Sequence, residues 1–277
     1  GILPSGWDSG LPVFAPKSPG EPTRMVNAPI VNALASAVPE LMGGAADLSP
    51  NTQTSIQSSQ NFCAAQPAGR NVRFGVREHA MAAITTGIAL HGGMRPFAAT
   101  FLIFSDYLRP ALRFAALNRA PVIFVFTNDS IGVGEDGPTH QPVEQLASLR
   151  AMPGITVLRP CDANEVTEAW KFALRNTGGP TCIILTRQPV PILDRSIYAP
   201  AEIQRGGYIL SEAMGGDPQA LILSSGSEVH LALEAQTTLQ KDGLRVRVVA
   251  LPCWSLFQQQ ERAYREMVLP AQIKVRV

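Results

Sequence analysis

The chain has 277 residues and a formal net charge of +1; 45% of the residues are hydrophobic and 16% are charged. This composition is typical of a globular protein with one large or two ordinary domains, and it is too apolar for a disordered chain. The near-neutral charge, and the absence of any apolar run approaching roughly 20 residues, indicate neither a nucleic-acid-binding protein nor a membrane protein.

The first part of the chain is predicted to alternate between helices and strands. Residues 1–22 are rich in proline and glycine and predict a linker, whereas residues 49–69 are rich in Ser, Asn and Gln and are expected to be irregular. The other patterns predict a helix over Ile30–Val38, strands from Leu41 and over Asn71–Gly75, a helix over Glu78–Leu90, a strand over Arg95–Ala99 and a helix capped by Thr100.

The alternation continues to the end of the chain. It predicts strands over Val122–Phe126, Ile155–Leu158 and Thr181–Leu185, helices from Pro142 and after Asp162, and a strand–helix–strand unit with Ser225 and Glu228 as a capping box. This pattern predicts an α/β fold, with a parallel sheet covered by helices on both faces and then part of a second, smaller α/β domain. The proline-rich run at Gln188–Pro200 predicts a linker between them.

We therefore expect a linker at 1–22, an α/β domain at 23–190, a linker at 191–204 and a truncated α/β domain at 205–277. The chain lacks an initiator Met, and its last residues, LPAQIKVRV, resemble the opening of another strand, so we expect a fragment of a longer protein. The cysteines show no C-x-x-C or Cys/His metal spacing, which is typical of reduced thiols in the cytoplasm. They are Cys63, Cys161, Cys182 and Cys253.

A polar loop follows the apolar run Val122–Phe126, which predicts a strand buried on both faces. The loop contains four ionisable side chains: Asp129, Glu135, Asp136 and His140. In open α/β sheets, ligands bind at the carboxyl ends of the strands, and long ordered loops inside compact domains are usually functional. The sequence therefore predicts a binding site in this loop.

Three glycines of the loop, Gly132, Gly134 and Gly137, match the dinucleotide fingerprint G-x-G-x-x-G after a strand. However, Glu135 and the following aspartate would place two negative charges against a pyrophosphate, and Pro138 lacks the N–H that an anion site needs. These residues disfavour a nicotinamide or flavin site.

Other candidate residues lie near the predicted strand ends. Phe101, Phe104 and Tyr107 are spaced to share one helix face, either as core packing or as an aromatic wall against a flat heterocycle. Glu78, at a helix start, is either a carboxylate stabilised by the helix dipole or a group facing a ligand. Arg24, Arg187 and His140 are either solvated cations or, together, a site for a phosphorylated substrate.

Long segments of the chain resemble transketolase. They include RFGVREHAMAAITTGIALHGG, TFLIFSDYLRPALRFAAL, PELMGGAADLSPNTQT, LTRQPVPIL and TNDSIGVGEDGPTHQPVEQLASLRAMPGITVLRPCDANE. The resemblance extends to LPSGWDSGLPVF near the start and so covers nearly the whole chain. It implies the pyrimidine-binding domain of that family, followed by the start of its carboxyl-terminal domain.

The resemblance implies roles for individual residues. Glu78 matches the glutamate that bonds N1′ of the aminopyrimidine ring of thiamine diphosphate, and His140 matches a residue at the reacting end of the sugar; these are the implied catalytic residues. Phe101, Phe104 and Tyr107 match the pocket of the pyrimidine ring, and Asp47 matches an acidic residue near the cofactor.

The resemblance also implies the substrate contacts. Asp136 matches a residue that contacts sugar hydroxyls, and Arg24 and Arg187 match two phosphate-binding arginines. Asn128 stands where some members carry histidine, and Asn51 where many carry serine; both are implied phosphate contacts. Asparagine donates hydrogen bonds but adds no charge, so these two positions bear on phosphate affinity rather than on the type of reaction.

The family binds the diphosphate and Mg²⁺ or Ca²⁺ through a GDG…N motif in an amino-terminal domain, which this sequence lacks. The resemblance therefore implies a homodimer with its active site between subunits, no metal ligands in this chain, and an inactive isolated fragment. It implies transfer of a two-carbon ketol unit between phosphorylated sugars, in the cytoplasm or a plastid. The alternatives are a dihydroxyacetone synthase and a non-catalytic module or small subunit of a two-chain enzyme.

Overall fold

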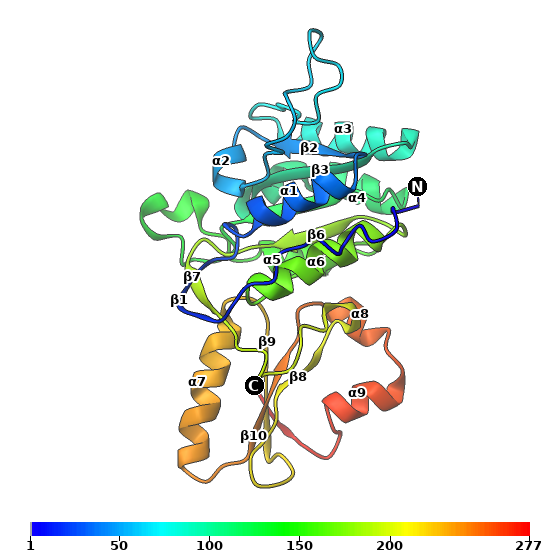
Figure 1. The fold of residues 1–277 in the computed structure, drawn as a ribbon. Coiled ribbons are helices and arrows are strands. Elements are labelled where there is room, and N and C mark those ends of the chain that lie inside the picture. Colours follow the sequence, from blue (N-terminus) through cyan, green and yellow to red (C-terminus); the bar gives the residue numbers. More distant parts are fainter. Residues whose placement is uncertain (1) are drawn as a thin grey trace.

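The computed structural model describes residues 2–277, which form two α/β units, one above the other in Figure 1. The first unit is built on a five-stranded sheet in which every neighbouring pair is parallel. In spatial order its strands are β2 (Leu41–Ala45), β3 (Arg95–Phe101), β4 (Ile123–Thr127), β6 (Thr181–Ile184) and β5 (Thr156–Leu158). The predicted fold class, a parallel sheet followed by a smaller α/β unit, is confirmed.

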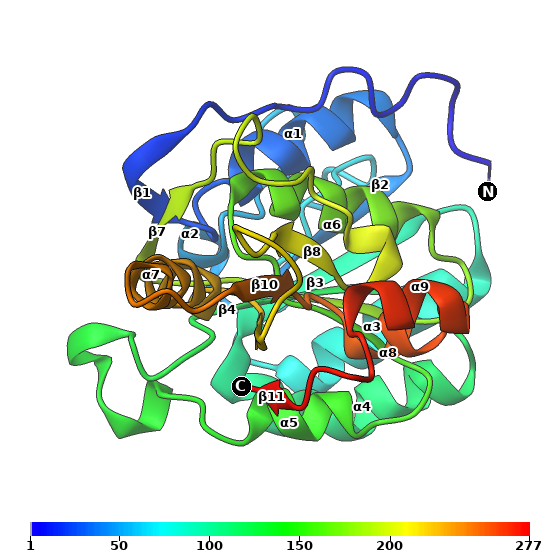
Figure 2. The ribbon, with the colours of Figure 1, turned by 90° about the horizontal axis from the view of Figure 1, so that it is seen from below.

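Helices cover both faces of this sheet because alternate strand residues point to opposite sides. Phe97 and Val125 belong to the core on one face, whereas Phe124 and Phe126 belong to the core on the other. Figure 2 shows these two layers on opposite sides of the strands. The first face is covered by α1 (Asn27–Ala37) and α6 (Ala163–Arg175), and the second by α3 (Glu78–His91), α4 (Ser105–Leu117) and α5 (Gln145–Arg150).

The second unit contains a four-stranded sheet in the order β11-β9-β10-β8. The predicted strand–helix–strand unit is present as β9 (Ala220–Ser224), α7 (Glu228–Lys241) and β10 (Val246–Ala250), and the chain ends in β11 (Val275–Arg276), parallel to β9. The antiparallel strand β8 (Tyr208–Ser211) and the helices α8 (Trp254–Gln258) and α9 (Arg262–Val268) complete it. Within residues 2–277, no helix combines the length and apolarity needed to cross a membrane.

Parts of both expected linkers are ordered strands. Lys17–Pro22 (β1) pairs antiparallel with Pro189–Ile192 (β7), far away in the sequence. Proline is tolerated in edge strands, since one side of such a strand needs no N–H for pairing. The proline content that predicts linkers here therefore belongs to a two-stranded ribbon beside the first sheet (Figure 1).

Two local predictions between residues 49 and 75 are wrong. Ser49–Thr52 forms the short helix α2, with Pro50 in its first turn, where proline is favoured. Asn71–Gly75 is not a strand; Asn71 only makes isolated bridges to Gly43 and Asn61. The Asn71 side chain instead accepts from the backbone N of Ile56 at 2.8 Å and donates back to its carbonyl at 2.9 Å. These bonds tie the segment to the preceding loop rather than into a sheet.

The predicted helix start at Thr100 is also wrong. β3 continues to Phe101, which pairs with Thr127 of β4, and a 3-10 turn, η1 (Leu102–Phe104), precedes α4. Thr100 lies in the strand and is fully buried, so its side chain does not cap a helix. In contrast, the predicted cap of α6 is confirmed, because Asp162 accepts a hydrogen bond from the backbone N of Glu165 at 2.8 Å.

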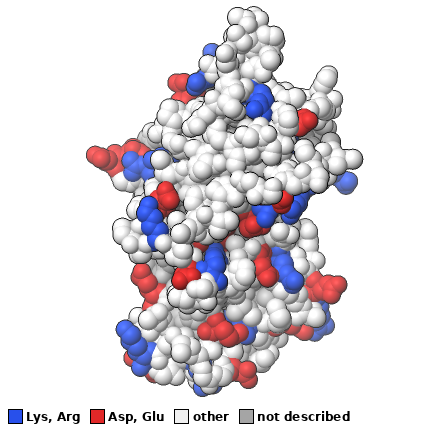
Figure 3. Space-filling view, viewed as in Figure 1, with Lys and Arg blue, Asp and Glu red and all other residues white. Residues whose placement is uncertain are grey.

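Polar side chains hold the two units together. Asp162, at the start of α6, pairs with Arg195 at 2.9 Å, and Glu165 accepts a hydrogen bond from the hydroxyl of Tyr208 at 2.5 Å. His230 of α7 lies with its Nε2 3.1 Å from the carbonyl oxygen of Cys161. Figure 3 shows charged side chains of both signs across the middle of the molecule, while much of the upper part is uncharged.

The buried His230 predicts a pH dependence of stability. Burial lowers its pKa below the usual value of 6.5, although the Cys161 carbonyl and the Asp162 charge act in the opposite direction. The unfolded chain therefore binds this proton more readily, so the free energy of unfolding should fall as the pH drops below about 6.5. Denaturant unfolding at several pH values should show that the free energy of unfolding changes less steeply with pH for His230→Gln than for the wild type. His91→Gln, which alters an exposed histidine, is the control for the substitution itself. Equal pH dependences of the wild type and His230→Gln would contradict this assignment.

Candidate active site

The carboxyl ends of the five parallel strands meet at one edge of the first sheet. This edge lies on the left in Figure 1, where the arrowheads of β2 and β6 point and the loop 128–144 projects. The loop contains two 3-10 turns, η2 (Gly134–Asp136) and η3 (Pro138–His140). The helix α3 packs on β3, and its last residue leads into the start of β3. The first residue of α3, Glu78, therefore lies at the opposite end, beside the carboxyl end of β3.

An aromatic group forms at the end of β3, although its residues do not share one helix. Phe101 ends β3, Phe104 lies in η1 and Tyr107 lies in α4. The rings of Phe101 and Phe104 are stacked with centroids 5.7 Å apart, and Tyr107 lies 5.9 Å from Phe104. His140 meets Phe104 edge-on at 5.4 Å. The structure thus brings the imidazole of the loop against the aromatic side chains, which the sequence pattern alone did not predict.

A second group contains four of the residues implied as substrate contacts. Arg24 donates from Nη1 to Oδ1 of Asn128 at 3.2 Å. Arg187 lies with its Nε 3.6 Å from a carboxylate oxygen of Asp136, and it also donates to the carbonyl of Val133. Burial and the neighbouring Arg187 charge lower the pKa of Arg24, while Asp136 acts in the opposite direction. Two guanidinium groups therefore lie near each other, and the Asp136 carboxylate lies beside one of them.

Polar atoms in this second group are left without partners among residues 2–277. Nδ2 of Asn128 and Nε of Arg24 are both buried and make no hydrogen bond there. Asn128 also has a left-handed backbone, with φ of 58°, which asparagine tolerates better than most residues. Because buried donors are normally paired, the unpaired Nδ2 of Asn128 and Nε of Arg24, near the guanidinium of Arg187, fit an anionic ligand that offers several oxygens.

Glu78 is only 7% exposed, and no hydrogen bond or ion pair joins its carboxylate to any of residues 2–277. Its oxygens are not among the fully buried unpartnered atoms of residues 2–277, so the carboxylate keeps some access at the surface and fits a position that faces a ligand with a hydrogen-bond donor. Asp47 and Asn51 follow β2 and are exposed. In the described part of the chain, no hydrogen bond joins the side chains of Asp47 and Asn51 to the other candidate residues. Asp47 and Asn51 thus lie at the same edge of the sheet but are not bonded to the rest of the site.

Two threonines that the sequence interpretation missed hold the arginines side by side. Thr23 and Thr186 are buried, and each backbone N donates to the hydroxyl of the other, at 2.9 and 2.8 Å. This reciprocal pair joins the end of β1 to the end of β6 and so places Arg24 next to Arg187. The repeated dipeptide Thr-Arg at both positions is the sequence signal that points to it.

Thr186→Val is expected to lower the free energy of unfolding by about 1–3 kcal/mol, because it leaves the buried N–H of Thr23 without an acceptor. The matched control is Thr85→Val, which removes a buried hydroxyl that donates to the carbonyl of Met81 within α3. That change leaves no backbone donor unpaired and should cost less. Denaturant unfolding of both variants measures the difference; equal losses would contradict the role given to the threonine pair.

Comparison with known proteins agrees with this geometry. The family model described as "Transketolase, pyrimidine binding domain" matches residues 21–192, which include the whole first sheet and all the candidate residues. The chain belongs to the transketolase family. A second model, described as "Transketolase-like TK C-terminal domain", matches residues 206–277.

Individual transketolases are similar over most or all of the chain. A transketolase of Geobacillus stearothermophilus is 50% identical over 100% of this chain and 42% of its own length. A crystal structure of a Pichia stipitis transketolase in complex with sedoheptulose-7-phosphate has a TM-score of 0.91 and 41% identity, covering 97% of this chain and 40% of that one. The chain thus spans about two fifths of the length of these relatives.

A second similar structure is described as a split gene transketolase, an inactive beta4 tetramer. It has a TM-score of 0.66 and 27% identity, and it covers 84% of this chain and 72% of that one. Its greater coverage shows that a transketolase chain can have a length comparable to this one.

Proposed function

We propose that this chain carries the pyrimidine-binding and sugar-binding part of a transketolase active site. The reaction is transfer of a two-carbon ketol unit from a ketose phosphate to an aldose phosphate. The single observation that carries the proposal is the meeting, at one sheet edge, of a buried unpartnered carboxylate, a stacked aromatic group and a pair of arginines. Membership of the transketolase family supports it.

The aminopyrimidine ring of thiamine diphosphate fits the first two of these features. Glu78 would hold the ring through a hydrogen bond to N1′, using the carboxylate that has no partner among residues 2–277. Phe101, Phe104 and Tyr107 would lie against the ring, because offset-stacked rings are favourable by about 0.5–1.5 kcal/mol per pair beyond burial, and Asp47 would lie near the cofactor. When bound, thiamine diphosphate supplies the carbanion chemistry of the transfer.

The substrate would occupy the space between the aromatic group and the arginines. Arg24 and Arg187 would each hold the phosphate in a bidentate manner, and Asn128 and Asn51 would donate further hydrogen bonds to it. Asp136 would accept hydrogen bonds from sugar hydroxyls once the phosphate takes Arg187 from it. His140, held against Phe104, would lie at the reacting end and move a proton there.

The diphosphate and its metal belong elsewhere in the proposed site. Among residues 2–277, no cluster of three or more His, Cys, Asp or Glu side chains is arranged to hold a metal ion. We propose, as the resemblance to the family implies, that Mg²⁺ or Ca²⁺ and the diphosphate are bound by another domain, in a homodimer whose subunits share each site. The proposed location is the cytoplasm or a plastid. The proposed units are an α/β domain at 23–190 and a second one at 205–277.

A comparison of acceptors tests the proposed function. The full-length gene product, supplied with thiamine diphosphate, Mg²⁺ and a ketose phosphate, should use ribose 5-phosphate far better than formaldehyde. The two arginines support this expectation, because formaldehyde has no phosphate for them to bind. A strong preference for formaldehyde would instead identify a dihydroxyacetone synthase. The subunit composition of the active gene product would distinguish a single-chain enzyme from a two-chain enzyme of the split-gene type.

A further inference from the structure

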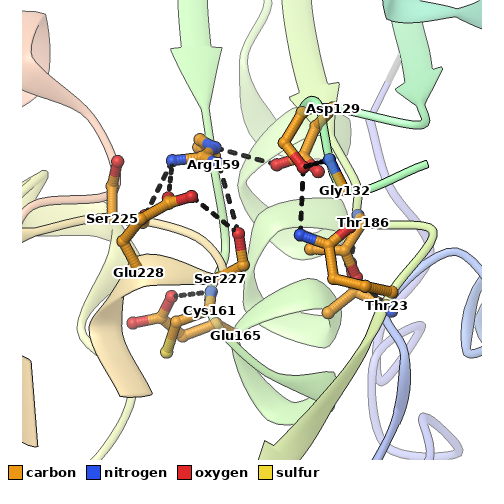
Figure 4. Close-up of polar contacts among 12 residues, drawn as sticks. Thr23, Asp129, Gly132, Arg159, Cys161, Glu165, Thr186, Ser225, Ser227 and Glu228 are labelled. Atoms are coloured by element: carbon orange, nitrogen blue, oxygen red, sulfur yellow. Dashed lines mark hydrogen bonds and ion pairs between the residues drawn. The ribbon is translucent and has the colours of Figure 1, made fainter. Parts of the chain in front are cut away.

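Arg159 lies outside the candidate site residues, yet its guanidinium connects the two units of the molecule (Figure 4). It follows β5 at the carboxyl edge of the first sheet, and its Nε donates to Oδ2 of Asp129 at 2.9 Å. On its other side, Nη1 donates to the carbonyl of Ser225 at 2.9 Å and pairs with the carboxylate of Glu228. Nη2 lies 3.4 Å from the hydroxyl of Ser227.

The backbone of Arg159 is held by the second unit as well. Its N donates to the carbonyl of Pro252 at 2.9 Å, and its carbonyl accepts from the N of Gly226 at 3.0 Å. Gly226 has φ of +63°, and a Cβ at this position would lie 2.6 Å from Nε of Arg159. A glycine is therefore required here, because only the absent side chain lets the turn at 225–227 close around the arginine.

The carboxylate that accepts from Nε of Arg159 belongs to Asp129, at the start of the loop 128–144 that would bind the substrate. Asp129 is buried and follows Asn128, whose side chain accepts from Arg24. Its neighbour Ser130 accepts from the side chain of Gln188 at 3.1 Å, and Val133 accepts from Arg187. Of these contacts with the loop, the one through Arg159 connects the loop to the second unit. Fixing Asp129 therefore fixes the backbone that presents Asn128 to the arginine pair.

The charges favour an ionic contact between Arg159 and Glu228, whereas burial raises the pKa of Asp129 against the lowering effect of Arg159. Burial alone would lower the pKa of Arg159, but the Asp129 and Glu228 carboxylates raise it above its usual value. Burial acts to raise the pKa of Glu228, but its hydrogen bond and ion pair with Arg159 hold it below its usual value. This explains why the predicted capping box at α7 is absent: Glu228 pairs with the arginine, while Ser225 accepts from Arg150 at 3.2 Å.

We propose that Arg159 is a positioning residue for the sugar-phosphate site, and that the second unit sets the geometry of the loop 128–144 through Glu228 and the turn at 225–227. The proposal rests on the proposed function, since it assigns a role in holding the loop that would bind the substrate. It gives the second unit a part in substrate binding without contact to the substrate.

Two glutamate substitutions test the proposal with closely matched surroundings. Glu228→Gln weakens a pair in which the glutamate side chain is 48% exposed and Arg159 is 9% exposed. Glu212→Gln weakens the pair with Arg247, where the corresponding values are 53% and 10%, entirely within the second unit. Both variants are made in the full-length gene product. A merely structural ion pair would predict the same behaviour for both.

Two measurements then follow. Hydrogen exchange without substrate should be faster in peptides covering 128–144 for Glu228→Gln and unchanged there for Glu212→Gln. In ketol transfer, Glu228→Gln should raise KM for the ketose phosphate roughly three- to tenfold, with a smaller effect on kcat, because the loop must be ordered on binding. Glu212→Gln should leave KM unchanged. Asp129→Asn combined with Glu228→Gln should raise KM by less than the product of the two single effects, since both act through Arg159.

Unchanged loop exchange and unchanged KM in Glu228→Gln would overturn the proposal, as would equal changes in the two glutamate variants. Thermal unfolding of both variants shows whether they lose similar stability, which the proposal expects. If the wild-type protein shows no ketol transfer, the proposed function fails, yet the exchange measurement still decides whether the second unit holds the loop. Gly226→Ala, which crowds Arg159 directly, should reproduce the faster loop exchange.

Discussion

Glu78→Ala is expected to lower kcat of the full-length gene product by roughly 10²–10⁴-fold, the usual contribution of a positioned group in proton transfer. The folded state should not suffer, because this 7% exposed carboxylate has no hydrogen bond among residues 2–277. The substitution breaks no hydrogen bond or ion pair among residues 2–277, and the helix dipole contributes less than about 1 kcal/mol. Steady-state kinetics at saturating thiamine diphosphate, with thermal unfolding alongside, measures both effects.

The control for this substitution is Glu78→Gln, which keeps the size of the side chain but loses its charge and its basicity. It should also turn over slowly while unfolding at the same temperature as the wild type. Near-wild-type turnover of Glu78→Ala would remove this residue from the proposed site. A large loss of stability would instead indicate a structural carboxylate.

Arg187→Ala is expected to raise KM for phosphorylated sugars by about 10–100-fold, which corresponds to loss of a charged hydrogen bond of about 1.5–3 kcal/mol. Unphosphorylated acceptors should be affected far less, because they have no group for this arginine to hold. Initial rates with phosphorylated and unphosphorylated forms of one aldose measure the difference. The same substitution also frees Asp136, which lies 3.6 Å from Arg187.

Arg175→Ala is the matched control, since Arg175 pairs with Asp8 at 2.8 Å on the surface and away from the sheet edge. It should change KM for neither kind of sugar. Equal increases of KM for both kinds with Arg187→Ala would show that the arginine only supports the loop through Val133.

The sequence predicted the elements in which one local signal dominates. The run Ile123–Thr127 is apolar at every position but its last and forms the central strand β4, and Asp162 caps α6 as its position indicates. The errors arise where distant pairing overrides the local signal. Phe101 remains in β3 because its neighbour Thr127 extends the ladder, and the prolines of β1 and β7 lie in a ribbon formed by segments far apart in the chain.

The candidate site shows the same limit. Position along the chain singled out most candidate residues and the resemblance to a family gave them roles, but neither spacing nor periodicity could place His140 against Phe104. The Thr23–Thr186 pair joins residues 163 positions apart, and Arg159 reaches Glu228 across two units. Such contacts depend on the arrangement of whole elements. A sequence signal exists only for the threonines, as a Thr-Arg dipeptide that follows the end of β1 and recurs after the end of β6.

The transfer of a labelled two-carbon unit tests the central claim most directly. The full-length gene product is incubated with thiamine diphosphate, Mg²⁺, an aldose phosphate and a ketose phosphate carrying ¹³C in its first two carbons. Mass spectrometry should find both labelled carbons in a new ketose phosphate two carbons longer than the acceptor, and omitting thiamine diphosphate should abolish this product. Label that stays in the donor, with the cofactor present, would contradict the account.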